Sequence, residues 1–290
     1  MKKNKLAKVL TFGLAAVMAL SLAGCGGNSG SADSEGGDIT VISREEGSGT
    51  RDAFVELTGV MQDDVDRTID TAEISNSTSV VTQSVAGNEA SIGYISMGSL
   101  DDSVKALKIG GVEATTDNVK SGDYELQRPF NIVTKGEVAE LPQDFINLIM
   151  SAEGQSIINE EGYIAVDDNA SNYEASGLTG SITLAGSTSV SPVMEVLADA
   201  YKKLNDGVTI EIQQTGSGAG IQSTIEGVCD IGMASRALED EEAAEGLECQ
   251  EIALDGIAVI VNTNNAAEDI TMEQIMKIYT GEITKWSEIQ

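Results

Sequence analysis

Apolar residues follow two different spacings along this chain, and the two alternate. Short apolar runs that are typical of buried strands occur at six places: Ile39–Ile42, Ser91–Ile95, Ile182–Ala185, Val208–Ile212, Asp230–Met233 and Gly256–Asn262. Helix-spaced apolar positions follow most of them, in Ala53–Leu57, Ser79–Ala86, Pro142–Met150, a stretch ending at Asn159, Val193–Leu204, Ile221–Val228 and Thr271–Tyr279. Alternation of this kind predicts an α/β fold.

Three stretches depart from this alternation. Glu125–Lys135 is a long extended run, and Pro129 favours extended backbone for the residue before it. Gly26–Gly37 and Val166–Gly180 are polar and have no apolar pattern. We interpret residues 25–37 as a flexible tether and Val166–Gly180 as a linker.

Residues 1–24 have the layout of a signal peptide. Four lysines among the first eight residues precede the apolar run Leu10–Leu22, which is short for a membrane span and is followed by small residues. Leu22-Ala23-Gly24-Cys25 resembles the bacterial lipobox, whose cysteine is acylated, for example with palmitate, and becomes the new N-terminus. We expect Cys25 to anchor the protein on the extracytoplasmic face of the cell membrane. If the segment is instead an uncleaved anchor, the domain that follows it is still expected on the extracytoplasmic face of the membrane.

The composition disfavours several kinds of chemistry. The formal net charge is −30 at pH 7, so nucleic acid and anionic lipid are not expected as partners. There is no histidine, which removes Ser-His-Asp and Cys-His nucleophiles and the common histidine-containing zinc sites. Cys229 and Cys249 remain once Cys25 is assigned to lipid, and they either pair or stay as small buried residues.

Three loops of one kind stand out. Each joins a predicted strand to a predicted helix and is rich in Gly, Ser or Thr: Arg44–Thr50, Gly186–Ser189 and Gly216–Gly220. Backbone N–H groups of such loops bind anions, and Arg44 adds a charged fork of donors. Ligands of open α/β sheets lie beyond the carboxyl ends of strands, where all three loops fall. Dinucleotide and P-loop fingerprints are incomplete here, so the sequence predicts an anion that is held and not transformed.

Eight segments together give the chain a specific resemblance to a known family. They are SREEGSGTRDAF, ASIGYISMG, RPFNIVT, GSTSVSP, TGSGAGI, DIGMASRAL, ALDGIAVIVN and ITKWSEI. Through them the whole mature chain resembles the periplasmic-type phosphate-binding proteins of phosphate ABC transporters. In that family GSTSVSP usually comes first and ITKWSEI leads into SREEGSGTRDAF. We interpret the different order as a circular permutation, with the usual termini joined through Val166–Gly180 and new ones opened beside Ile39 and Gln290. The alternative is a gene-model artefact that fused the end of one copy to the start of another.

The resemblance implies a two-lobed type II periplasmic binding protein (Venus-flytrap) fold with hinge crossover strands. The crossover strands would be GIAVIVN and ELQRPFNIVT. One lobe would be continuous over residues 128–255. The other would be split between residues 38–127 and 256–290.

The resemblance also implies the phosphate ligands, which would be Arg44, Glu46, Ser48, Gly49, Thr50, Thr188, Ser189 and Ser217. A carboxylate such as Glu46 accepts a hydrogen bond from protonated phosphate and repels sulfate. Arg236 stands where some members have an aspartate; we expect it to contact the ion, and a salt bridge to a surface acid is the alternative.

Purely structural roles remain alternatives for some of these residues. Arg44 could pair only with Glu45 or Glu46, and Ser217 and Thr188 could be plain helix caps. Arg51, one residue past the first loop, is expected to face solvent.

Together these observations predict a monomeric, lipid-anchored receptor that binds inorganic phosphate between two lobes and delivers it to ABC permease subunits. Neither a cofactor nor a metal is expected. An anion-binding module for signalling or adhesion, without transport, is the alternative from another class. An enzyme acting on phosphate esters is disfavoured, because histidine and a clear metal cluster are both missing from the sequence.

Overall fold

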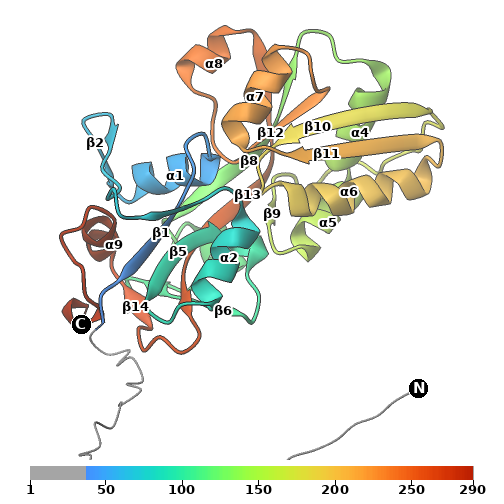
Figure 1. The fold of residues 1–290 in the computed structure, drawn as a ribbon. Helices are drawn as coiled ribbons and strands as arrows, with labels where there is room; N and C mark the ends of the chain where they lie inside the picture. Colours follow the sequence, from blue (N-terminus) through green and yellow to red (C-terminus); the bar gives the residue numbers. More distant parts are fainter. Residues whose placement is uncertain (1–36, 290) are drawn as a thin grey trace, which may run out of the picture. The chain divides into compact units, whose positions relative to one another are not determined.

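The computed structural model describes residues 37–289 (Figure 1). The predicted signal peptide, the lipid-attachment residue Cys25 and nearly all of the tether lie outside the described residues. The helices are α1 (Gly49–Leu57), α2 (Thr78–Ala86), α3 (Thr116–Ser121), α4 (Glu140–Ile149), α5 (Ala152–Glu160), α6 (Ser191–Leu204), α7 (Ser217–Ile225), α8 (Asp240–Ala244) and α9 (Met272–Tyr279). The longer strands are β1 (Thr40–Arg44), β5 (Ser91–Ser96), β8 (Gln127–Lys135), β10 (Gly180–Gly186), β11 (Val208–Gln214), β12 (Ile231–Ala234) and β13 (Leu247–Asn262). Shorter strands are β2 (Met61–Gln62), β3 (Val65–Asp66), β4 (Glu73–Ser75), β6 (Val104–Ala106), β7 (Lys108–Ile109), β9 (Ile164–Ala165) and β14 (Asp269–Ile270).

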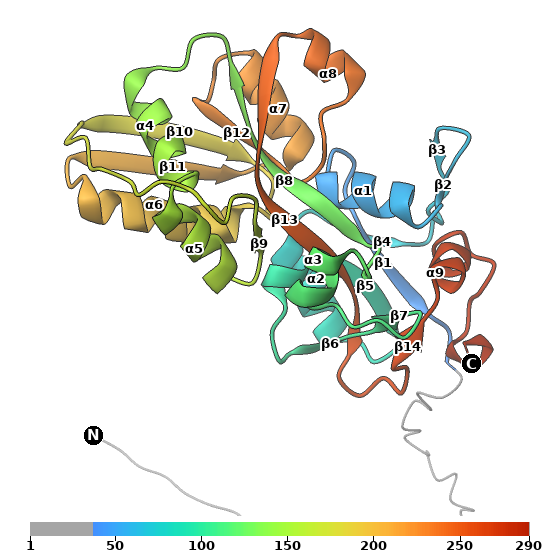
Figure 2. The same ribbon diagram turned by 180° about the vertical axis from the view of Figure 1, so that it is seen from behind.

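The main sheet runs in the order β11-β10-β12-β8-β13-β5-β1-β4. At one end β10 pairs in parallel with β11 and β12, and at the other end β1 pairs in parallel with β4 and β5. Antiparallel β8 and β13 join the two parallel parts. Figure 2 shows β8 and β13 running side by side through the middle of the molecule. The α/β prediction is confirmed.

The two largest apolar cores of the described residues lie on either side of this crossing. We call the elements around the first core the first lobe. Phe54, Tyr94 and Tyr279 lie at its centre, and the rings of Phe54 and Tyr94 stack at 3.9 Å. The second lobe surrounds another core, in which the rings of Phe145 and Tyr201 meet edge to face at 5.2 Å. The aromatic anchors of the first core therefore come from both ends of the described chain, whereas those of the second come from its middle.

A buried ion pair fixes the crossing strands. Arg128 of β8 donates to Asp255 of β13 from Nε and Nη2, at 3.2 and 3.1 Å, and Ser96 donates to the other carboxylate oxygen at 2.9 Å. Burial raises the pKa of Asp255 to about 6, although Arg128 and Ser96 pull it down. Arg128 also donates to the carbonyl of Ser235, 3.3 Å away. The crossing is thus tied to the loop that follows β12.

Other predicted features can be placed in this fold. Helix α7 covers Ser217–Ile225 and ends before the predicted last residue, Val228, because Gly227 turns the chain at φ 69° and leaves Val228 exposed. The predicted linker contains neither helix nor strand before β10 begins at Gly180. Cys229 is buried, Cys249 is exposed, and both are free thiols. The described ends of the chain lie together, because Ile39 N donates to Thr284 O at 2.7 Å.

Candidate functional site

The three loops that the sequence singled out meet between the lobes. Parallel pairing of β10 and β11 places the loops after them side by side, and Thr215 N donates to Gly186 O at 2.9 Å. The loop between β1 and α1 approaches from the first lobe. Its Gly47 carbonyl accepts a hydrogen bond from Gly218 N, at the start of α7, over 3.0 Å. Strand order and parallel pairing therefore bring the loops together, as the sequence predicted.

Hydroxyl groups from both lobes gather there with one arginine. We call Thr50, Thr78, Thr188 and Ser189 the hydroxyl cluster. Thr50 Oγ1 lies 2.9 Å from Ser189 Oγ, and Thr78 Oγ1 lies 3.2 Å from both Thr188 Oγ1 and Ser189 Oγ. Arg44 Nη2 donates to Thr188 Oγ1 at 3.1 Å. All five residues are buried, so one guanidinium and four hydroxyls meet away from bulk water.

A second group of hydroxyls lies behind the α1 loop. Ser187 Oγ donates to Ser235 Oγ at 3.0 Å, and Ser217 Oγ lies 3.3 Å from the same oxygen. A Cβ on Gly49 would lie 2.5 Å from Ser217 Oγ and 2.9 Å from Ser235 Oγ. Only a glycine lets the α1 loop approach this closely. The N–H groups of Gly49 and Thr50 lie in the first turn of α1, where backbone donors have no acceptor within the helix.

Arg44 is held in place by several partners. Its Nε and Nη2 donate to the two carboxylate oxygens of Glu45, both at 2.8 Å, and Nε also reaches Ser75 O at 3.2 Å. Its backbone N–H donates to Tyr94 OH at 3.1 Å. A guanidinium fixed from behind in this way is preorganised for an oxyanion in front. The pairing with Glu45 therefore coexists with the contact to Thr188.

Neither Ser217 nor Thr188 is the N-cap of a helix. Gly216, with φ 91°, is the N-cap of α7, and the Ser217 hydroxyl accepts from Ser235 N at 3.1 Å. Thr188 precedes α6, whose N-cap is Val190. Ser48 is an N-cap, and its Oγ accepts from Arg51 N at 3.4 Å. Ser48 is nevertheless buried beside Gly49 and Thr50.

Two predicted ligands are not brought to the hydroxyl cluster. Glu46 is exposed on the α1 loop, and Glu45 is the acid that reaches Arg44. Arg236 instead donates to Asp52 at 2.9 Å and to both carboxylate oxygens of Glu242 at 2.7 and 2.8 Å. This is the salt-bridge alternative, with one of the acids on the opposite lobe.

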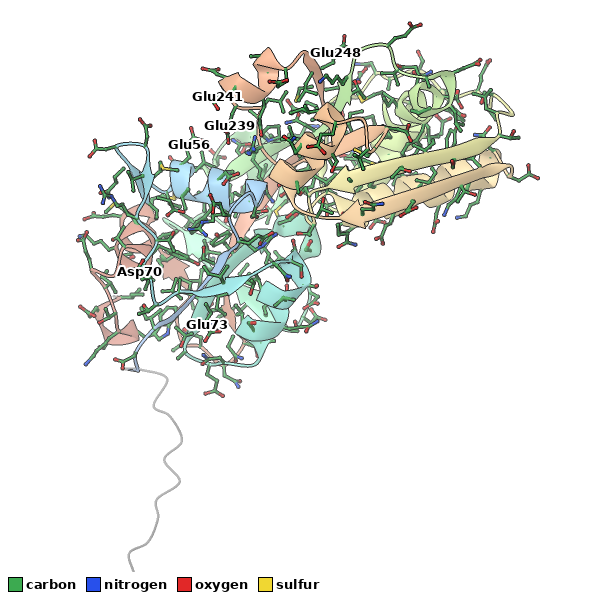
Figure 3. All side chains as sticks on the ribbon, turned by 45° about the horizontal axis from the view of Figure 1, so that its top comes forward. Glu56, Asp70, Glu73, Glu239, Glu241 and Glu248 are labelled. Carbon is green, nitrogen blue, oxygen red and sulfur yellow. The ribbon has the colours of Figure 1, made fainter. Side chains whose placement is uncertain are left out.

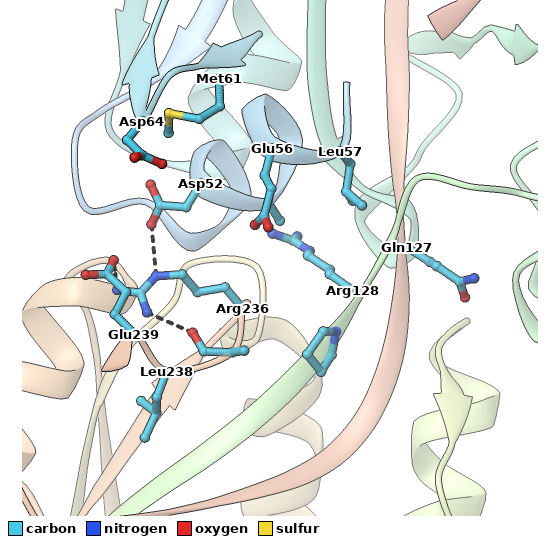
Figure 4. A pocket seen from close by; sticks show the side chains of 13 residues that line it. Asp52, Glu56, Leu57, Met61, Asp64, Gln127, Arg128, Arg236, Leu238 and Glu239 are labelled. Carbon is cyan, nitrogen blue, oxygen red and sulfur yellow. Dashed lines mark hydrogen bonds and ion pairs between the residues drawn. The ribbon is translucent and has the colours of Figure 1, made fainter. Parts of the chain in front are cut away.

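The Arg236 contacts lie in a cleft of about 840 Å³ between α1 and the loop after β12 (Figure 4). Asp52 and Arg236 approach each other across it, the carboxylates of Asp64 and Glu239 lie near this pair, and Glu56 lines the same cleft. Burial raises the pKa of Asp52 and outweighs the pull of Arg236. Burial alone would lower the pKa of Arg236, but Glu242 and Asp52 reverse the effect and raise it. The cleft thus contains an ion pair that spans the two lobes.

One expectation near the site is wrong. Arg51 does not face solvent: its Nε donates to Asp66 at 2.7 Å and its Nη1 to the carbonyl of Arg44 at 2.8 Å. The side chain is 20% exposed, and it braces the start of the loop.

Thr78 and Ser235 lie among these hydroxyls, although neither was singled out from the sequence. Thr78 opens α2 after a strand of three residues, β4, which is too short to give an apolar run. Ser235 directly follows β12. Its signal was a hydroxyl at the carboxyl end of a predicted strand, which was available in the sequence.

Glu45 pairs with Arg44 beside the hydroxyl cluster, whereas many other acids of the chain are exposed on the surface. Figure 3 labels six of them, distributed over both lobes and all exposed: Glu56, Asp70, Glu73, Glu239, Glu241 and Glu248. The cluster itself contains neutral hydroxyls and one guanidinium. Exposed charges are screened by salt, so they act weakly on a buried anion.

Residues 37–289 contain neither a metal-binding cluster nor a membrane-spanning helix. No three His, Cys, Asp or Glu residues in this range are arranged to hold a metal ion. No helix in the same part of the chain has the length and apolar character needed to cross a membrane.

A family model described as a PBP superfamily domain matches residues 5–153 and 171–290. A crystal structure of the phosphate-binding protein of a phosphate ABC transporter from Streptococcus pneumoniae TIGR4 is similar to the fold, with a TM-score of 0.71 and 48% identity. The match covers 88% of this chain and 100% of that one. The fold is therefore a two-lobed type II binding-protein fold.

Curated relatives narrow the class further. Phosphate-binding protein PstS 2 of Streptococcus agalactiae serotype V is 47% identical over 296 residues, which cover 100% of this chain and 99% of the relative. The PstS protein of Bacillus subtilis is 32% identical over 113 residues, 38% of each chain. This chain belongs to the PBP superfamily and, within it, to the family of PstS phosphate-binding proteins.

Proposed function

We propose that the protein binds inorganic phosphate between its lobes and delivers it to an ABC permease. The observation that carries this proposal is the buried meeting of Arg44 with hydroxyls from both lobes. Arg44 Nη2 in the first lobe and Thr188 Oγ1 in the second are 3.1 Å apart. The S. agalactiae and S. pneumoniae relatives are named phosphate-binding proteins, which supports the choice of ion.

The proposed ligands divide into charged, hydroxyl and backbone groups. Arg44 supplies the positive charge, and Ser48, Thr50, Thr188, Ser189 and Ser217 supply hydroxyls. The N–H groups at Gly49 and at the starts of α1, α6 and α7 add dipoles directed at the ion. An anion removed from water is held more strongly by such fixed donors than by mobile solvent. Glu46 and Arg236 lie outside this set.

We propose that residues 38–127 with 256–290 and residues 128–255 move as the two lobes. The positions of the two cores support this division. Closure brings Thr188 and Ser189 onto Arg44 and Thr50, and opening separates them. The hinge would lie in β8 and β13, which cross between the lobes.

We propose that Cys25 is lipid-modified after removal of residues 1–24 and holds a monomeric protein on the extracytoplasmic face of the membrane. The basic and apolar pattern of residues 2–22 and the lipobox-like sequence at Cys25 support this. The permease would then lie in the same membrane.

We propose that the segment order is a true circular permutation of the usual family order. The S. agalactiae relative aligns from end to end, which supports an order common to both and argues against an artefact. The B. subtilis relative aligns over only 38% of this chain, as expected when order differs. The adjacency of Ile39 and Thr284 supports new termini opened at a former connection.

Calorimetric titration of the chain from residue 26 onward with phosphate, sulfate and molybdate tests the function. We expect phosphate binding, and Arg44→Ala should weaken it at least tenfold, because a charged hydrogen bond to a desolvated ion is lost. Arg67→Ala, which removes an exposed arginine from the same lobe, is the matched control. Absence of phosphate binding by the folded wild-type protein would refute the receptor. Equal affinity of the two variants would remove Arg44 from the site.

A further inference from the structure

We infer that Thr78, at the start of α2, is a fourth arm of the anion site. This inference rests on the proposed phosphate function and adds a ligand from an element that none of the three glycine-serine loops contains. The observation behind it is the position of the Thr78 hydroxyl, 3.2 Å from two hydroxyls of the opposite lobe.

The local structure leaves this hydroxyl available. The N-cap of α2 is Ser77, whose Oγ accepts from Val80 N at 3.3 Å, so capping is carried out by the neighbouring residue. The Thr78 side chain turns instead toward the Gly186–Ser189 loop. Its backbone N–H also points there and donates to Thr188 Oγ1 at 3.4 Å. Both polar groups of Thr78 thus face the cluster.

Thr78 is positioned by the same contacts that position Arg44. Strand β4 pairs in parallel with β1 and places Ser75 opposite Arg44. The Ser75 carbonyl accepts from Arg44 Nε at 3.2 Å. Three residues later the chain starts α2, so the guanidinium and the Thr78 hydroxyl are fixed to one another through β4.

The Thr78 arm borders a cavity at the surface of the hydroxyl cluster. The cavity has a volume of about 420 Å³, and Thr78, Ser99, Thr188 and Gln214 are among the residues that line it. Ser99 Oγ is buried and has no hydrogen-bond partner among residues 37–289. Hydroxyl and amide groups make up most of the polar lining, and the carboxylate of Asp101 also lines the cavity.

The chemistry of a threonine fits this role. A hydroxyl donates one hydrogen bond and accepts others, so Thr78 can donate to a phosphate oxygen or accept from a protonated one. It adds no charge, and no carboxylate of the described chain bonds directly to the four cluster hydroxyls. We expect Thr78 to strengthen phosphate binding about tenfold, the effect of one hydrogen bond to a charged group.

The test compares Thr78→Val with Thr58→Val by calorimetry with phosphate. Thr58 is a buried threonine of the same lobe at the end of α1, and its hydroxyl donates to the Phe54 carbonyl at 2.6 Å, away from the cluster. Both variants lose one hydroxyl group and keep the side-chain shape. We expect the dissociation constant to rise about tenfold for Thr78→Val and to stay unchanged for Thr58→Val, with Thr78→Ser near the wild type.

The outcomes separate this inference from the proposed function. If the wild-type protein binds phosphate and Thr78→Val binds as tightly as Thr58→Val, Thr78 is not a ligand and the receptor stands. If the wild-type protein does not bind phosphate, the proposed function fails, and the inference fails with it. Thermal unfolding checks that each variant is folded. Thr78→Ala, which suits a helix start, replaces the valine variant if that one unfolds.

Discussion

The close approach of Gly49 to the second lobe gives a sharp prediction about closure. In the Gly49→Ala variant the new Cβ would lie 2.5 Å from Ser217 Oγ and 3.0 Å from Ser217 Cβ. Ordinary contacts of this kind begin at about 3.5 Å, so the lobes must separate locally by roughly 1 Å. Alanine keeps the N–H, so no donor is lost. The variant therefore tests the fit between the lobes alone.

The magnitude follows from the cost of overpacking. Inserting a methyl group into a close-packed contact typically costs about 1–3 kcal/mol. Ser217 and Ser235 lie on the opposite lobe, so this cost falls only on the closed arrangement. It converts to a rise in the phosphate dissociation constant of roughly 5- to 150-fold. The unfolding free energy without phosphate should stay level or rise, because alanine favours the helix that begins at this residue.

Calorimetry and small-angle X-ray scattering measure the two consequences. Gly218→Ala is the control, because its Cβ would lie 3.4 Å from Gly47 Cα, an ordinary contact at the same interface. We expect Gly218→Ala to bind phosphate nearly as the wild type does. We expect Gly49→Ala to keep a larger radius of gyration at phosphate concentrations that close the wild type. Equal affinity of the two alanine variants would refute the closed geometry.

Two further predictions concern ion pairs. Asp52→Asn removes the ion pair with Arg236 between the lobes and should speed phosphate release several-fold in stopped-flow measurements. Asp66→Asn breaks an ion pair within one lobe and should leave the release rate unchanged. Equal release rates of the two variants would show that the Asp52–Arg236 pair does not hold the lobes together. Asp255→Asn keeps this position neutral at every pH, so urea titrations should find its unfolding free energy closest to that of the wild type at pH 7, where the wild-type carboxylate is ionised. Because the folded pKa of Asp255, about 6, lies above its ordinary value, the wild-type advantage over Asp255→Asn should fall as pH rises from about 4 to 6; a constant difference would contradict the raised pKa.

Local patterns identified the elements whose side chains are buried on both faces. Val259 and its apolar neighbours predict the second part of β13, but the strand begins earlier, at Leu247. Glu248–Glu251 are exposed and polar, so periodicity gives no sign that they are a strand. Likewise β2 and β3 turn through Asp63 and Asp64 at positive φ, where glycine or asparagine would have given a signal.

The candidate site was predictable where chemistry and chain geometry coincide. The glycine-serine loops predict backbone N–H donors, and Arg44 begins one of these loops. Which neighbouring acid faces Arg44 depends on the turn after β1, and the structure selects Glu45 over Glu46. Arg236 and Asp52 are 184 residues apart in the chain, so no local sequence pattern predicts the hydrogen bond between them. Contacts between the lobes are therefore what the sequence alone could not supply.

The mixed origin of the first core determines the order in which the lobes can fold as the chain is made. Tyr279, near the end of the chain, packs against Phe54 and donates to the carbonyl of Ile42 at 3.1 Å. The second core draws on Phe130–Ala253 and is complete in sequence before Tyr279 is synthesised. Domains normally fold from the N-terminus as they emerge. Here the N-terminal half of the first lobe, with its anion loop, must wait for the last helix, so the second lobe can fold first.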